Sequence, residues 1–214
     1  MLVTKTAPDF TATTVMPDNS FKDITLSDYR GKKVVLFFYP LDFTFVWPSE
    51  LIAFDNRINE FEKRNVQVLG CSVDSQFSHL RWKEMDVNKG GIGNIKYPLI
   101  SDLNKSIARA YDVLLGAKPA TVLLEDEEIE TTIDGNVTIR GSFLIDENGV
   151  IRHAVLNDLP LGRNIDEMLR MVDALAFHTE NGDVCPANWT EGKTAMNPSD
   201  DGMRKYMAEE SDNL

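Results

Sequence analysis

Cysteine and histidine are scarce in this chain of 214 residues, which has two cysteines and three histidines. Cys71 and Cys185 lie far apart, without metal-ligand residues beside them, which excludes a secreted disulfide framework. No Cys-x-x-Cys pair occurs, which disfavours a dithiol oxidoreductase. His79, His153 and His178 lack the spacing of a zinc site. We therefore expect no bound metal, and we interpret the three histidines as ordinary surface or interface residues.

Long hydrophobic runs and an excess of basic charge are also missing. The longest apolar run, residues 34–38, is far shorter than the roughly 20 residues that a membrane-spanning helix needs. The chain has 22 basic and 34 acidic residues, and its net charge of −12 repels phosphate backbones and anionic membranes. Residues 1–5 contain no apolar signal region. We expect a cytoplasmic protein with neither nucleic acid nor membrane as a partner.

Apolar residues make up 43% of the chain, which is enough for one well-cored domain. Residues 34–39 form a β-rich apolar run of the kind that is buried on both faces of a sheet. Pro48 suits the first turn of a helix, and Glu50 suits the positive end of that helix. Helical spacing then continues to about residue 61, and residues 66–73 predict the next strand. This order predicts a right-handed βαβ unit in a mixed sheet.

Later segments add further helices and a hairpin. Residues 76–85 and 101–111 predict helices, and Asn164 with Glu167 forms a capping box for a helix that follows. Strands over 138–146 and 150–156 flank the turn sequence Glu-Asn-Gly. We expect an α/β fold with a central mixed sheet flanked by helices over residues 1–178, and a polar C-terminal arm over 179–214. Periodicity alone leaves several α/β folds open.

Three segments, in order along the chain, resemble the active-site segments of the typical two-cysteine peroxiredoxins, of the alkyl hydroperoxide reductase C or thioredoxin peroxidase type. The segment Pro-Leu-Asp-Phe-Thr-Phe-Val-Trp carries Pro40 and Thr44 of the family signature Pro-x-x-x-Thr-x-x-Cys. Trp47 occupies the position of the peroxidatic cysteine. Arg140 matches the active-site arginine, and Cys185 matches the resolving cysteine. Each match alone has an ordinary explanation, but their common order favours the catalytic interpretation.

The resemblance implies a thioredoxin-like fold and a thiol-dependent peroxidase for hydrogen peroxide and organic hydroperoxides, with no cofactor. In the family, a thiolate attacks the O–O bond, and the resulting sulfenic acid condenses with the resolving cysteine of a partner subunit. It implies that Thr44 orients the peroxide, that Pro40 shields the sulfur, and that Arg140 lowers the thiol pKa. It also implies that Arg163 supports Glu50 near the site.

Partners are likewise implied by the resemblance. Thioredoxin or a dedicated flavoprotein reductase supplies electrons in this family, and homodimers assemble into decamers. Phe43, Phe77 and His79 match regions that meet at the dimer–dimer interface. The alternative function that we keep open is a holdase-type chaperone or oligomeric scaffold, because it would survive the loss of the nucleophile.

Trp47 decides what this chain itself can do. An indole cannot attack a peroxide, so we expect a catalytically dead form of the enzyme. Because the rest of the site remains, we interpret Trp47 as a substitution in an otherwise competent enzyme, rather than as a mark of an old pseudoenzyme or a partner-binding aromatic. Overpacking a core by even a methylene or two costs roughly 1–3 kcal/mol. We therefore expect the first helical turn to unravel after Val46, with the ring swung outward.

Two further features have structural interpretations. Cys71 lies in a predicted core strand, so we expect a buried and inert thiol. Residues 115–137 form a long stretch that contains Glu-Asp-Glu-Glu, for which a solvated acidic loop or hairpin is predicted.

Overall fold

The computed structural model describes residues 1–44, 47–116, 118–124, 127–133 and 137–213. Within this part, the chain forms two compact units, Met1–Arg163 and Asn164–Leu214. The sequence placed the start of the C-terminal arm at residue 179, and that boundary stays a prediction.

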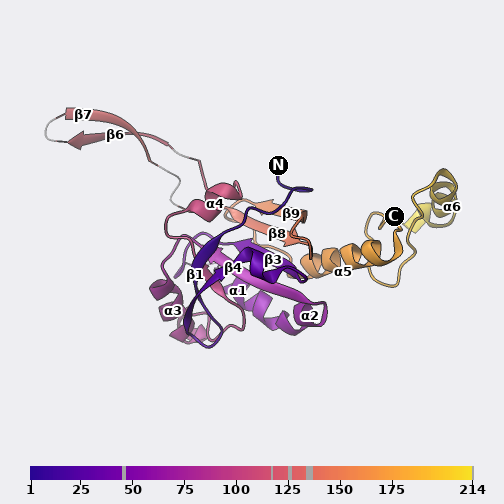
Figure 1. Cartoon of the computed structure of the whole chain (residues 1–214), viewed down its shortest axis with the longest axis horizontal. Coiled ribbons are helices and arrows are strands. Elements are labelled where there is room, and N and C mark those ends of the chain that lie inside the picture. Colours follow the sequence, from indigo (N-terminus) through magenta and orange to yellow (C-terminus); the bar gives the residue numbers. More distant parts are fainter. Residues whose placement is uncertain (45–46, 117, 125–126, 134–136, 214) are drawn as a thin grey trace. The chain divides into compact units, whose positions relative to one another are not determined.

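Unit 1 is built on a seven-stranded sheet with the strand order β2-β1-β5-β4-β3-β8-β9 (Figure 1). The pairs β3–β4 and β4–β5 are parallel and the remaining pairs are antiparallel. The predicted mixed sheet is therefore confirmed. The strands are β1 (Thr11–Val15), β2 (Phe21–Thr25), β3 (Lys33–Phe38), β4 (Val66–Ser72), β5 (Leu99–Ser101), β8 (Arg140–Ile145) and β9 (Ile151–Asn157).

The helices of unit 1 follow the predicted βαβ rhythm, with α1 and α2 between β3 and β4 (Figure 1). Helix α2 packs against β4, and α3 packs against β1 and β5. The helices are α1 (Trp47–Asn56), α2 (Ile58–Lys63), α3 (Gln76–Glu84) and α4 (Ser106–Ala110), with 3₁₀ turns η1 (Leu26–Tyr29) and η2 (Val87–Lys89).

Strand β3 is buried on both faces, as its continuous apolar sequence predicts. Alternate side chains, Val34, Leu36 and Phe38, belong to a core cluster that also contains residues of β4, β5, β8 and α4. On the opposite face, Phe37 stacks on Phe54 of α1, with 4.3 Å between ring centroids. Since successive side chains of a strand point to opposite faces, β3 is the central support for both layers of the unit.

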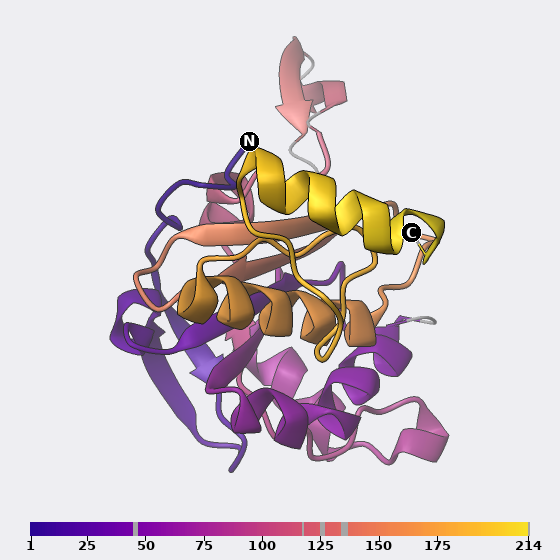
Figure 2. The ribbon, with the colours of Figure 1, turned by 90° about the vertical axis from the view of Figure 1, so that its right-hand side faces the viewer.

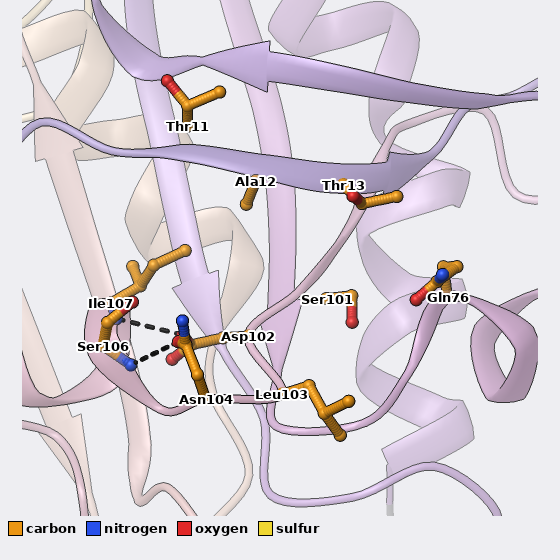
Figure 3. A pocket seen from close by; sticks show the side chains of 10 residues that line it. All are labelled: Thr11, Ala12, Thr13, Gln76, Ser101, Asp102, Leu103, Asn104, Ser106 and Ile107. Atoms are coloured by element: carbon orange, nitrogen blue, oxygen red, sulfur yellow. Dashed lines mark hydrogen bonds between the residues drawn. The ribbon is translucent and has the colours of Figure 1, made fainter.

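Two predicted helices differ from the structure. The helix over residues 51–61 is divided into α1 and α2 at Arg57, whose backbone leaves the helical region at φ −110°. The helix predicted from residue 101 begins only at Ser106, because Ser101 ends β5 instead. Asp102 accounts for the later start, because its carboxylate accepts the backbone N–H of Ile107 at 3.0 Å (Figure 3). It also accepts the backbone N–H of Ala108 at 2.7 Å.

Two hairpins complete unit 1. The predicted turn between β8 and β9 is confirmed: Asp146 accepts two backbone N–H groups there, and Gly149 has φ +79°, which glycine tolerates. In the long acidic stretch, β6 (Lys118–Leu124) and β7 (Glu127–Ile133) pair as an antiparallel hairpin, one of the two predicted forms.

Unit 2 contains α5 (Ile165–Asn181), α6 (Asp200–Glu210) and the 3₁₀ turn η3 (Ser211–Asn213). Asn164 caps α5 by accepting the N–H groups of Asp166 and Glu167, as predicted. The chain after α5 then folds back along that helix (Figure 2), where Trp189 packs on Phe177 at 5.0 Å between ring centroids. The sequence predicted only a polar arm here and missed α6.

The burial of Lys83 in α3 can be tested through the pH dependence of the free energy of unfolding. Its side chain is buried, its ammonium donates to the carbonyl of Met16 at 2.7 Å, and burial lowers its pKa to about 8. Above pH 8 the folded state has released a proton that the unfolded chain, with an ordinary lysine pKa of about 10.4, still holds. The stability contributed by Lys83 therefore rises with pH across that window.

We predict that the unaltered chain gains free energy of unfolding relative to Lys83→Met as the pH rises from about 8 to about 10. Urea unfolding of both proteins over this range gives the difference at each pH, so other titrating groups cancel. A difference that stays flat, or that falls with pH, contradicts the assignment.

Candidate active site

The start of α1 is fixed by a carboxylate that lies between two arginines. Glu50, in the first turn of α1, is only 4% exposed. Its Oε1 accepts the backbone N–H of Arg163 at 2.8 Å and Nε of the same residue at 3.1 Å. Its Oε2 accepts from Nη2 of Arg163 at 3.0 Å and from Nη1 of Arg140. Every oxygen of this buried carboxylate is thus paired with a cation.

The two arginines connect α1 to the sheet. Arg163 donates from Nη1 to the carbonyls of Phe38 and Gly141, at 2.8 and 2.9 Å, and its guanidinium lies 5.0 Å from the centre of the Phe37 ring. Arg140, which opens β8, is fully buried and donates from Nε to the carbonyl of Leu159 at 2.8 Å. The predicted support of Glu50 by Arg163 is present in the structure, and Arg140 joins the same cluster.

Electrostatics keep this cluster charged. Burial alone would raise the pKa of Glu50, but Arg163 and Arg140 together outweigh that effect and hold it below its ordinary value. Burial lowers the pKa of Arg140, and the Glu50 carboxylate opposes that shift. The cluster holds two cations and one anion, so it leaves a net positive charge close to the N-terminus of α1. Both that charge and the helix dipole favour an anion at this position.

The loop between β3 and α1 carries two more of the predicted site residues. Pro40 is buried and Thr44 is half-buried. The hydroxyl of Thr44 donates to the carbonyl of Leu41 at 2.9 Å. Because its single proton is committed there, Thr44 offers only lone pairs to any other group, and it can only accept a hydrogen bond from a ligand.

Trp47 is the first residue of α1, so the expected unravelling of the first turn is wrong. Pro48 preorganises that turn, and Glu50 anchors it to the two arginines. Phe45 and Val46, together with the side chain of Trp47, lie outside the described part of the chain. The expectation that the ring swings outward therefore stays a prediction.

The two cysteines lie in different units, and both are free thiols. Cys71 is fully buried in β4, which confirms the predicted burial, and burial raises its pKa well above the ordinary value. That the thiol is inert stays a prediction. Cys185 is partly buried in unit 2, with Sγ 3.5 Å from the carbonyl of Ala174. Burial raises its pKa and Arg170 partly opposes the shift.

Among the described residues, no group of three histidine, cysteine, aspartate or glutamate side chains is arranged to hold a metal ion. In the same part of the chain, no helix is both long and apolar enough to cross a membrane. A polar cavity of about 410 Å³ between β1, α3 and residues 101–107 shares no lining residue with the Glu50 cluster (Figure 3).

Comparison with known proteins decides the family. Residues 3–154 match the sequence model of the AhpC/TSA family. Alkyl hydroperoxide reductase C of Helicobacter pylori (strain J99) is 48% identical over 213 residues, which cover 99% of this chain and 98% of that protein. The chain belongs to the AhpC/TSA family of peroxiredoxins. Residues 174–209 of this peroxiredoxin also match a model described as the C-terminal domain of 1-Cys peroxiredoxin.

Two further relatives support the assignment to the peroxiredoxins. The mitochondrial thioredoxin-dependent peroxide reductase of Drosophila melanogaster is 48% identical over 208 residues, 96% of this chain and 81% of the relative. The crystal structure of the reduced 2-Cys peroxiredoxin of Plasmodium vivax matches with a TM-score of 0.86 at 47% identity, covering 97% and 99% of the two chains. The expected thioredoxin-like α/β fold of a peroxiredoxin is confirmed.

Sequence reasoning misplaced one residue of this peroxiredoxin. His79 was expected at the surface or at an interface, but its side chain is fully buried beside Asp42 and Tyr39. The signal that was available is position: on α3, His79 precedes the buried Trp82 by three residues, so both lie on the face that packs against the sheet. A histidine on such a face needs buried polar partners.

We predict that Glu50→Gln lowers the free energy of unfolding of this peroxiredoxin by roughly 3–5 kcal/mol at pH 7, because it leaves two buried cations short of their anion. Since the folded-state pKa of Glu50 lies below its unfolded value, the stabilisation is present above about pH 4.5. It is lost as the pH falls through the lower, folded-state value. Urea unfolding of both proteins from pH 7 downward should therefore show the gap narrowing in acid.

Glu60→Gln is the matched control, because Glu60 also pairs with two cations, Lys63 and Arg64, but does so at the surface. If both substitutions lower the free energy of unfolding by the same amount, burial of Glu50 does not increase the cost of removing its charge.

Proposed function

We propose that the active site of this chain is built to reduce hydrogen peroxide and small organic hydroperoxides with a thiol at position 47, and that Trp47 silences the reaction. The observation that supports this most is the buried Arg140–Glu50–Arg163 cluster at the start of α1. Such a cluster costs free energy to bury, and it concentrates positive charge where a thiolate must form.

The chemistry follows from the residues around that position. A thiolate attacks one peroxide oxygen, an S–O bond forms as the O–O bond breaks, and the leaving oxygen takes a proton to give water or an alcohol. Thr44, whose proton is committed to Leu41, accepts the peroxide hydrogen and so orients the substrate. Arg140 stabilises the negative charge that grows on the oxygens. Pro40, buried beside the loop, limits the access of water.

The sulfenic acid is then resolved by Cys185 of a partner subunit, which displaces water and forms an intersubunit disulfide. A dithiol reductant returns both sulfurs to thiols. Relatives whose names specify thioredoxin-dependent peroxide reduction and alkyl hydroperoxide reduction support thioredoxin or a flavoprotein reductase as the electron donor. A cytoplasmic location is part of the proposal, because the cycle requires a compartment in which both thiols are regenerated.

We predict that Trp47→Cys restores peroxide consumption with dithiothreitol, whereas the unaltered chain and Trp47→Ser remain at background. Serine matches cysteine closely in size but lacks the nucleophile, so it separates relief of crowding from chemistry. If Trp47→Cys folds and is inert, the site is vestigial. Suppression of client aggregation by the unaltered chain would then favour the holdase or scaffold function.

Assembly into dimers and then a decamer is the remaining part of the proposal. Phe43 and Phe77 are 49% and 65% exposed, and Phe77 meets Phe21 edge to face at 5.5 Å between ring centroids. Exposed aromatic side chains that gather in this way are typical of an interface. His79 lies on α3, as Phe77 does, but its side chain is fully buried, so it is not one of the residues that contact another dimer.

We predict that Phe77→Asp shifts the sedimentation coefficient of the chain from that of a decamer to that of a dimer. The new carboxylate would be buried without a cationic partner when dimers associate, and this destabilises the decamer. Val87→Asp is the control, since Val87 is also an exposed apolar residue, at 56%. If Phe77→Asp still sediments as a decamer, α3 is not part of the surface through which dimers associate.

A further inference from the structure

A buried polar cluster holds the loop that leads into α1. Asp42, the fourth residue after β3, is 6% exposed, and Tyr39 and His79 are fully buried. The hydroxyl of Tyr39 donates to Oδ1 of Asp42 at 2.9 Å, and Oδ2 of Asp42 lies 2.8 Å from Nδ1 of His79. One loop carboxylate is thereby joined to the end of a core strand and to helix α3.

The partners of His79 define its role. Nε2 lies 3.1 Å from the carbonyl of Ile100, which can only accept, so this nitrogen carries a proton. Nδ1 lies 2.8 Å from Oδ2 of Asp42 and 3.3 Å from the hydroxyl of Tyr39, so both ring nitrogens have buried hydrogen-bond partners. Removal of either the His79 or the Asp42 side chain would leave a buried polar group of the other without its partner, which costs free energy.

The backbone of Asp42 is anchored as well. Its N–H donates to Oδ2 of Asp74 at 2.9 Å, and the same oxygen accepts the hydroxyl of Ser72 at 2.7 Å. Ser101 donates to the carbonyl of Asp74 at 2.7 Å. Ser72 and Ser101 end the paired parallel strands β4 and β5. The loop is thus tied to the carboxyl edge of the sheet through side chain and backbone alike.

The residue after this anchor is strained. Phe43 has φ +57°, in the left-handed region that residues other than glycine rarely adopt, and its ring lies 5.8 Å from that of Trp82. Strain of this kind persists only where the surroundings over-determine the backbone. Asp42 on one side and the Thr44–Leu41 hydrogen bond on the other supply that constraint. The orientation of Thr44 therefore depends on Asp42 staying in place.

We propose that His79 is a positioning residue, which, by fixing Asp42, holds the strained loop that orients Thr44 and sets the first turn of α1. The intact start of α1 at Trp47 agrees with a preceding loop that is fixed by contacts of Asp42 rather than by contacts of position 47. The structural part of this inference stands alone. Its consequence for peroxide chemistry rests on the proposed function.

Hydrogen–deuterium exchange in the unaltered chain and in His79→Gln tests the structural part without any catalysis. We expect amides of residues 40–50 to exchange at least roughly tenfold faster in the variant, because local opening is no longer opposed by the His79–Asp42 contact. Amides of β8 and β9 should keep their rates. Tyr111→Phe removes a hydrogen bond of 3.0 Å to the carbonyl of Pro8 in the core cluster on the opposite face of the sheet. It is the matched control and should spare residues 40–50.

Unchanged exchange over residues 40–50 in His79→Gln, or an increase spread evenly over unit 1, overturns the proposal. If His79→Gln fails to fold, exchange over residues 40–50 in Tyr39→Phe tests the proposal instead. Tyr39→Phe keeps the His79–Asp42 contact but removes one donor to Asp42, and it must open the same residues to a smaller extent.

The catalytic consequence is measured with Trp47→Cys as the parent. Adding His79→Gln should lower kcat/KM for peroxide by roughly 10- to 100-fold through misplacement of Thr44. The kcat at saturating peroxide, set by dithiol reduction, should stay nearly unchanged. Asp42→Asn should match this loss, and the double variant should lose no more than either single one. Inactivity of Trp47→Cys itself defeats the proposed function alone, whereas equal falls in kcat and kcat/KM defeat the positioning role.

Discussion

The buried contact of Glu50 with Arg163 and Arg140 is the interaction on which the rest of the site depends. An unpaired carboxylate at this depth would cost several kcal/mol, so α1 can begin where it does only with both arginines in place. Arg163 in turn donates hydrogen bonds to carbonyls of β3 and β8, two adjacent strands of the sheet. The start of α1 is therefore fixed to the sheet, and the position held by Trp47 is fixed with it.

The loop before α1 is held from the opposite direction, by His79 and Asp42. Two separate buried clusters, Arg140–Glu50–Arg163 and Tyr39–Asp42–His79, thus bracket a short stretch of chain that carries a strained residue, Phe43. Neither cluster includes position 47. This arrangement explains how the peroxiredoxin scaffold keeps the start of α1 when position 47 carries a tryptophan, a residue that cannot act as the nucleophile.

Much of the fold and of the site could be predicted, because the signals are local. The apolar run of β3, the Glu-Asn-Gly turn and the cap at Asn164 each specify their own structure within a few residues. The site residues could be found because their motifs resemble those of a known family. The late start of α4 was missed although its cause is local, because Asp102 accepts the N–H groups of Ile107 and Ala108 only five and six residues further on. The partners of His79 could not be predicted, because Asp42 and Ile100 lie far from it along the chain. Periodicity in one segment indicates which face is buried, but it does not identify the polar groups that meet there.

The central claim is that the site is complete apart from its nucleophile, and the pKa of a thiol placed at position 47 tests it most directly. Ultraviolet absorbance of the thiolate in Trp47→Cys, with Cys71 and Cys185 replaced by serine, follows that single group with pH. The arginine cluster and the helix N-terminus predict a pKa below about 7. A value near 8.5, that of an ordinary cysteine, would contradict the account, because the surviving charges would then exert no effect at the position where the chemistry takes place.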